Sequence, residues 1–91
     1  MNTYQIDGKP EILGFTNLKR VDEEEFFAGI LEKLKENPNI SVGEKKTGPS
    51  EDTYECSISD IPFILLYDVD YGPSIYAENQ EAIRNLKQYF G

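Results

Sequence analysis

Histidine and tryptophan are absent from this 91-residue chain, and cysteine occurs once, as Cys56. Histidine is the most frequent general base and the side chain that titrates nearest neutral pH. Without it, serine and cysteine nucleophiles lack their usual activating partner, and a zinc site of the Cys/His type cannot form within one chain. A single cysteine also excludes an intrachain disulfide, which fits a reducing compartment. We therefore predict a cytoplasmic protein that is not an enzyme and holds no metal or cofactor.

Long apolar runs and an excess of basic residues are missing as well. No stretch approaches the roughly 20 apolar residues that span a bilayer, and residues 1–9 lack the apolar centre of a secretory signal. The chain carries 17 acidic and 9 basic side chains, for a net charge of −8. Phosphate backbones are bound mainly by Lys and Arg, so this balance disfavours nucleic-acid binding. We predict no direct contact with nucleic acid and none with a membrane.

The apolar residues that are present suffice for a small core. Ile, Leu, Val and Phe together account for 24 of the 91 residues. This fraction exceeds the level of about 20% below which a highly charged chain tends to be disordered. No composition shift, repeat or low-complexity tract divides the chain, so we predict one domain over residues 1–91.

Capping residues and helical spacing mark two helices. Asp22 is a suitable N-cap and Asn37-Pro38 a stop signal, which predicts a helix over residues 22–36. Asn79 and Gly91 bound a second helix in the same way. Each helix has one apolar stripe. The stripe residues are Phe26, Phe27, Ile30, Leu31 and Leu34 in the first helix, and Ala82, Ile83, Leu86 and Phe90 in the second.

Short alternating segments predict the strands. A hairpin around Asp7-Gly8 is expected at the start, and Ile61-Pro62 is expected to lie in a connection outside any ladder. The other expected strands are 40–44, 53–58, 63–69 and 74–77. The order is then ββ-α-ββββ-α. Each helix must bury its apolar stripe, and one face of a sheet can cover both stripes. We therefore predict an α+β two-layer sandwich, with a mainly antiparallel sheet of about five or six strands and both helices on one face.

Acidic residues and tyrosines concentrate in the C-terminal half. Residues 51–91 have a net charge of −6 and contain five of the six tyrosines, and residues 47–83 contain no Lys or Arg. Tyrosine is enriched at protein interfaces, and carboxylates steer a basic partner. The acidic run at residues 22–25 has a local explanation, since a helix N-terminus favours negative charge. The alternative is that the acids serve solubility and the tyrosines are ordinary sheet residues.

The segment from Phe63 to Asp70 indicates where a partner would bind. Phe63, Leu65, Tyr67 and Val69 share one predicted face, and Ile64, Leu66, Asp68 and Asp70 share the other. If the first set meets the helices, the second presents an apolar spot beside two carboxylates, which is typical of a binding surface. The alternatives are that loops or the N-terminal hairpin cover this spot, or that it forms a homodimer.

Asp68-Val69-Asp70 also admits a metal interpretation. Carboxylates at alternate strand positions project in parallel and offer oxygen ligands to Mg²⁺ or Ca²⁺. The chain lacks the spaced ligands of a calcium-binding loop, so a metal-assisted enzyme is the weakest of three hypotheses, and we predict no metal site.

The leading hypothesis is a non-enzymatic acidic protein that binds a basic protein surface. Its expected contact residues are Glu55, Ile64, Leu66, Asp68, Asp70, Tyr71 and Tyr76. In size and charge the chain is similar to toxin-immunity proteins, nuclease inhibitors and nucleic-acid mimics, a likeness that assigns no residue a role. The alternative is a small homodimeric regulatory or ligand-binding module that uses the open sheet face.

Overall fold

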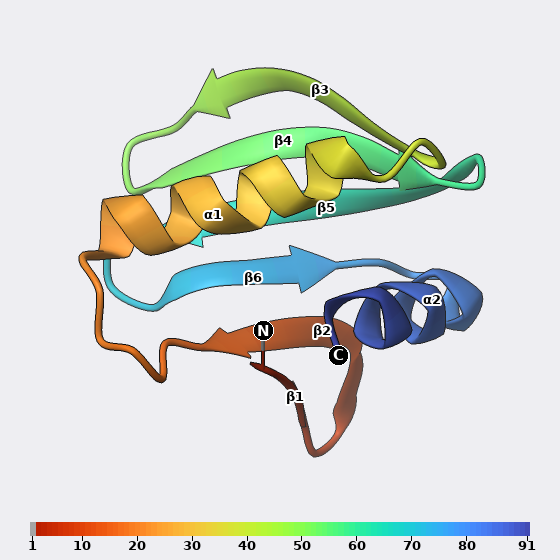
Figure 1. Cartoon of the computed structure of the whole chain (residues 1–91), viewed down its shortest axis with the longest axis horizontal. Coiled ribbons are helices and arrows are strands. Elements are labelled where there is room, and N and C mark those ends of the chain that lie inside the picture. Colours follow the sequence, from red (N-terminus) through yellow and green to blue (C-terminus); the bar gives the residue numbers. More distant parts are fainter. Residues whose placement is uncertain (1) are drawn as a thin grey trace.

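The computed structural model describes residues 2–91, which form six strands and two helices in the predicted order ββ-α-ββββ-α (Figure 1). The strands are β1 (Asn2–Ile6), β2 (Lys9–Thr16), β3 (Ile40–Thr47), β4 (Glu51–Ile58), β5 (Ile61–Asp68) and β6 (Gly72–Tyr76). The helices are α1 (Glu23–Glu36) and α2 (Gln80–Phe90). The predicted α+β fold class is confirmed.

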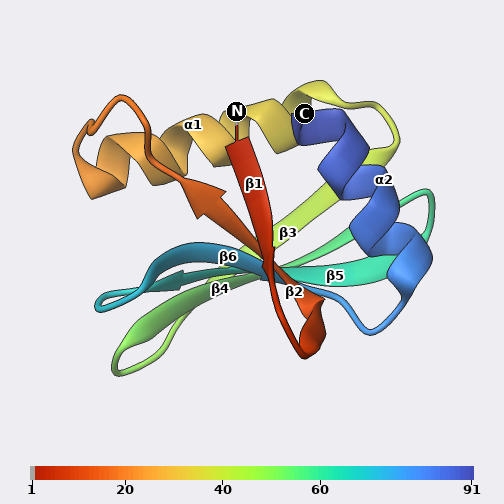
Figure 2. The same cartoon turned by 90° about the horizontal axis from the view of Figure 1, so that it is seen from below.

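All six strands belong to one antiparallel sheet with the order β1-β2-β6-β5-β4-β3. β6 therefore lies between β2 and β5. α1 connects β2 to β3, which is the strand at the opposite edge of the sheet from β1. Figure 2 shows both helices on one side of a strongly twisted sheet and no helix on the other side. Such twist accumulates from the right-handed twist of each strand. We call the side without helices the open face.

The helices begin where the sequence predicts. The carboxylate of Asp22 accepts the backbone N–H two residues on at 3.2 Å, and the side-chain oxygen of Asn79 does the same at 2.8 Å. Each helix thus has an N-cap that satisfies a free backbone donor. α2 ends before Gly91, whose φ of 96° is the left-handed conformation common after a helix. Within residues 2–91, no helix is both long and apolar enough to cross a membrane.

The core lies between the helices and the sheet. Leu13, Ile75 and Leu65 form one row across β2, β6 and β5, and all three are fully buried. The ring of Phe15 meets that of Phe90 in α2 edge to face, with centroids 4.9 Å apart. The other buried apolar side chains are Ile30, Leu34, Ile40, Cys56, Ile58, Phe63, Ala77, Ala82, Ile83 and Leu86. Both predicted helix stripes therefore supply the core.

Both predicted boundaries of β5 are wrong. The strand begins at Ile61 and includes Pro62, because β6 pairs with β5 only from Ile64 onward and no bond to β6 is lost at the proline. At its other end β5 stops at Asp68. Val69, expected on the helix side, lies in the following turn with 67% of its surface exposed.

Candidate binding surface

A row of apolar side chains crosses the middle of the open face. Ile12 of β2, Tyr76 of β6 and Ile64 of β5 are paired neighbours, so their side chains project from the same side of the sheet. All three are at least partly exposed, and Tyr76 retains 40% of its accessible surface. The core on the other side of the sheet contains their buried strand neighbours Leu13, Phe63, Leu65, Ile75 and Ala77. This row is therefore an apolar surface that no element of the described chain covers.

The next row contains Leu66 of β5, Ser74 of β6 and Gly14 of β2. Tyr4 of β1 pairs with Gly14, and a Cβ at position 14 would collide with the Tyr4 ring. The N-terminal hairpin therefore extends the sheet and its Tyr4 ring covers Gly14, while Ile64 and Leu66 stay partly exposed. We call the set Tyr4, Ile12, Ile64, Leu66 and Tyr76 the open-face strip.

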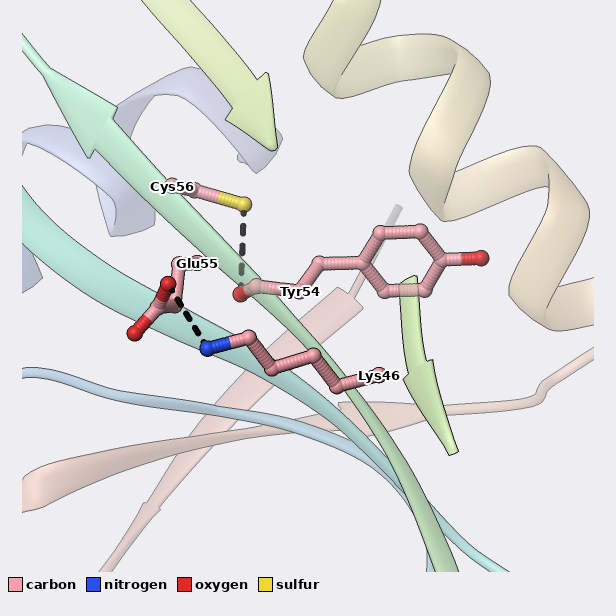
Figure 3. Close-up of polar contacts among 4 residues, drawn as sticks. All are labelled: Lys46, Tyr54, Glu55 and Cys56. Carbon is pink, nitrogen blue, oxygen red and sulfur yellow. Dashed lines mark hydrogen bonds and ion pairs between the residues drawn. The ribbon is translucent and has the colours of Figure 1, made fainter. Parts of the chain in front are cut away.

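Carboxylates border the strip on the β4 side. Glu55 is paired with Ile64 and shares its face, and its Oε2 lies 3.1 Å from Nζ of Lys46 (Figure 3). Both side chains of this ion pair are largely exposed, so it contributes at most about 1 kcal/mol and leaves Glu55 accessible. Farther along the same two strands, Glu51 is paired with Asp68. The border is thus predominantly negative.

A hollow of about 480 Å³ lies beside the strip, where β6 leads into α2. Pro62, Ile64 and Tyr76 contribute apolar surface to it, while Glu55 and Glu78 contribute carboxylates. Its volume falls within the range of about 300–1,000 Å³ that is usual for ligand sites. An apolar centre with a polar rim is the usual anatomy of a protein interface.

The remaining predicted contact residues lie in the turn between β5 and β6. Oδ1 of Asp68 accepts the backbone N–H groups of Asp70 at 2.7 Å and Tyr71 at 3.1 Å, so this carboxylate closes the turn. Tyr71 is 90% exposed. The expectation that Asp68 and Asp70 project in parallel from one strand is wrong, because β5 ends at Asp68. The turn precedes β6, whereas Tyr76 lies at the far end of that strand (Figure 1).

Acidic side chains from both halves of the chain meet on the helix side. Tyr67 of β5 is paired with Asp52 of β4, and the first turn of α1 lies near the same end of the sheet (Figure 1). Burial raises the pKa of Tyr67, and the nearby carboxylates of Glu23, Glu24, Asp22 and Asp52 raise it further. The acidic run at the start of α1 therefore joins the acidic C-terminal half in space, in addition to its local role in the helix.

Cys56 lies on the helix side of β4. Burial raises the pKa of its thiol, and hydrogen bonds involving the backbone of Gly43 and Leu65 partly offset this effect. Its Sγ lies 3.5 Å from the carbonyl oxygen of Tyr54 (Figure 3). A buried, protonated thiol is a poor nucleophile. Across residues 2–91, no three Asp, Glu, Cys or His side chains are grouped so as to hold a metal ion.

No protein-family model, curated protein or solved structure matches this chain. Functional interpretation therefore depends on the residues and their arrangement. Tyr4 and Ile12 belong to the open-face strip but are absent from the contacts predicted from sequence. The alternation of residues 11–15 places Ile12 and Gly14 on one side of β2. The pairing of β2 with β6, which joins Ile12 to Tyr76, leaves no local signal in the sequence.

Proposed function

We propose that this protein is a non-enzymatic binding protein of the cytoplasm that docks onto a basic protein surface through the open-face strip. One observation carries the proposal: Ile12, Tyr76 and Ile64 form a partly exposed apolar row on a sheet face without helices, bordered by carboxylates. Contiguous exposed apolar patches with polar rims mark interaction sites on small proteins. A role as an inhibitor, immunity protein or molecular mimic is consistent with such a surface.

The apolar centre and the acidic border have different effects on binding. Tyr76 and Ile64 contribute affinity, because buried aromatic and aliphatic anchors dominate interface energies. Glu55 and Glu78 are part of the net charge of −8 and accelerate the encounter with a basic partner. Salt screens this attraction beyond about 10 Å at 0.1 M. Apolar substitutions should therefore raise the dissociation rate, and charge neutralisation should lower the association rate.

A second copy of this chain fits the surface less well than a basic partner does. In a two-fold dimer through the strip, each copy brings the same carboxylates, Glu55 and Glu78, to the interface. Each copy also carries a net charge of −8. The lysine that borders the strip, Lys46, already pairs with Glu55 of its own chain. Like charges brought together oppose association, so charge complementarity favours a basic protein.

The test compares two double variants, each of which truncates one β-branched aliphatic residue and one tyrosine, at different places on the surface. Ile64→Ala/Tyr76→Ala truncates the strip, and Val69→Ala/Tyr71→Ala truncates the exposed β5–β6 turn. Each is immobilised beside the wild-type chain and exposed to extract of the native cell, and retained proteins are identified by mass spectrometry. We expect the wild type and the turn variant to retain a basic protein that high salt releases. The strip variant should not retain this protein.

Kinetics with the purified partner complete this test. Glu55→Gln/Glu78→Gln should slow association at low salt, and it should change the dissociation rate little. The proposal is overturned if the strip variant retains the same protein as wild type. It is also overturned if that protein is acidic, or if sedimentation shows a wild-type homodimer that the strip variant abolishes.

A further inference from the structure

A second hollow, of about 400 Å³, lies on the helix side of the sheet between α1 and strands β4 and β5. Three aromatic side chains line it, Phe27 from α1, Tyr54 from β4 and Tyr67 from β5. The carboxylates of Glu24 and Asp52 lie at the same hollow. We call it the aromatic groove. It lies on the opposite side of the sheet from the open-face strip, so a ligand bound here does not depend on the proposed docking surface.

The aromatic rings support one another. The centroid of Phe27 lies 4.9 Å from that of Tyr67 at an interplanar angle of 65°, and 5.8 Å from that of Tyr54 at 40°. Figure 3 shows the Tyr54 ring reaching from β4 toward a helix. Rings packed in this way hold their orientation before a ligand arrives, so binding them costs little conformational entropy.

The electrostatic character of the groove is negative. Burial is the largest cause of the raised pKa of Tyr67. The other causes are carboxylates at the start of α1 and the carboxylate of Asp52. The N-terminus of α1 opposes this with a partial positive charge of about half a unit. Four negative charges, on Asp22, Glu23, Glu24 and Asp52, exceed this partial charge and the single positive charge of Lys45 taken together. A cation is therefore stabilised here and an anion is not.

The chain places one of its own cations at this groove. Nζ of Lys45, on the edge strand β3, lies 3.5 Å from Oδ2 of Asp52, and Lys45 lines the hollow. About half of the Lys45 side chain is exposed, and such pairs are worth at most about 1 kcal/mol. An external cation can therefore displace this ammonium at low cost.

We infer that the aromatic groove binds the guanidinium group of an arginine side chain, with Tyr54 and Tyr67 contacting its plane and Asp52 accepting its hydrogen bonds. A planar guanidinium stacks on aromatic rings and pairs with a carboxylate through two parallel donors. A lysine ammonium is more strongly hydrated and lacks the planar fork. In the free protein Lys45 competes with the ligand for Asp52, so this lysine lowers the affinity for arginine.

The inference is tested by titrating N-acetyl-arginine amide into the isotope-labelled full chain and following the ring protons of Tyr54 and Tyr67 by NMR. We expect saturable shifts of these signals. Asp52→Asn should weaken binding by about 1.5- to 5-fold, the range for partly exposed ion pairs. Lys45→Met should strengthen it by a similar factor. Glu44→Gln removes a carboxylate from β3 outside the groove and should leave the affinity unchanged.

Asp52→Asn also alters a partly buried position of the sheet. Glu24→Gln, on the exposed surface of α1, is therefore a second variant that should weaken arginine binding, and it leaves the sheet intact. The inference is overturned if no saturable shift occurs at either tyrosine, or if Lys45→Met weakens binding. It is also overturned if N-acetyl-norleucine amide, which lacks the charge, binds equally well, or if tetramethylammonium binds more tightly. Ile64→Ala/Tyr76→Ala should leave arginine binding unchanged, which separates this site from the open-face strip.

Discussion

Leu65 and Leu66 are adjacent on β5, but their side chains lie on opposite faces of the sheet, and this offers a sharp test of the open face. Leu65 is fully buried in a row with Tyr54 and Ile75, whereas Leu66 is partly exposed. Truncation of a fully buried leucine to alanine costs about 2–5 kcal/mol, because a cavity remains in addition to the lost transfer free energy. We expect about 3 kcal/mol for Leu65→Ala, out of a total stability of roughly 5–14 kcal/mol for 91 residues.

Leu66→Ala should cost much less. Full burial of a leucine is worth about 1.5–3 kcal/mol, and Leu66 buries only part of its surface, so a loss of about 1 kcal/mol is expected. The difference of about 2 kcal/mol corresponds to roughly 8–16 °C in Tm for a domain of this size. Urea unfolding followed by circular dichroism measures both losses, with equal m-values as the check on a common unfolding reaction.

Equal losses for Leu65→Ala and Leu66→Ala would refute this reasoning. They would mean that Leu66 packs in a second core, and the open face would then be no docking surface. If Leu66→Ala remains folded, as expected, it also becomes a probe of the open-face strip, since any loss of partner binding cannot be attributed to unfolding.

Substitutions at Gly14, Tyr67 and Asp68 should change the free energy of unfolding, which urea unfolding measures. Gly14→Ala should destabilise the protein by about 1 kcal/mol, the low end of the range for overpacking, because the new methyl group displaces the ring of the half-exposed Tyr4, and adding Tyr4→Ala should recover part of the loss. The folded pKa of Tyr67 lies above its ordinary value of 10.0, so the protonated phenol's contribution to stability is complete below pH 10 and is lost as pH rises through the folded pKa. Tyr67→Phe should therefore lose less stability than wild type above pH 10, and an identical alkaline profile would contradict this. Asp68→Ala should cost about 1–3 kcal/mol through two lost turn hydrogen bonds; Asp68→Asn, which keeps an acceptor, should cost less, and Asp70→Ala should change little.

Local signals predicted the elements because their physical causes are local. An N-cap such as Asp22 or Asn79 satisfies backbone donors within its own first turn, and the apolar stripes of both helices follow from a period of 3.6 residues. The alternation in β4 and β5 likewise assigns neighbouring residues to opposite faces. The end of β5 was mispredicted because apolar character continues to Val69, whereas the hydrogen bonds that Asp68 accepts from the turn end the strand.

The candidate surfaces depended on pairings between residues far apart in the chain. Sequence placed Ile64 and Leu66 on one side of a strand, but only the insertion of β6 between β2 and β5 set Tyr76 and Ile12 beside Ile64. Strand order and register are decided by which faces can be buried together, and β2 and β6, which pair here, are separated in the chain by α1 and three other strands.

By itself, then, the sequence determined which side chains this chain lacks and which segments are helices and strands. The absence of histidine and the charge of −8 are properties of composition, and caps and periodicity act within a few residues. Tertiary structure alone decided where the negative charge gathers. The acidic residues at the start of α1 have a local explanation in the helix dipole. The packing of α1 against the sheet brings them close to Asp52 and Tyr67, which lie about 30 to 45 positions away in the chain.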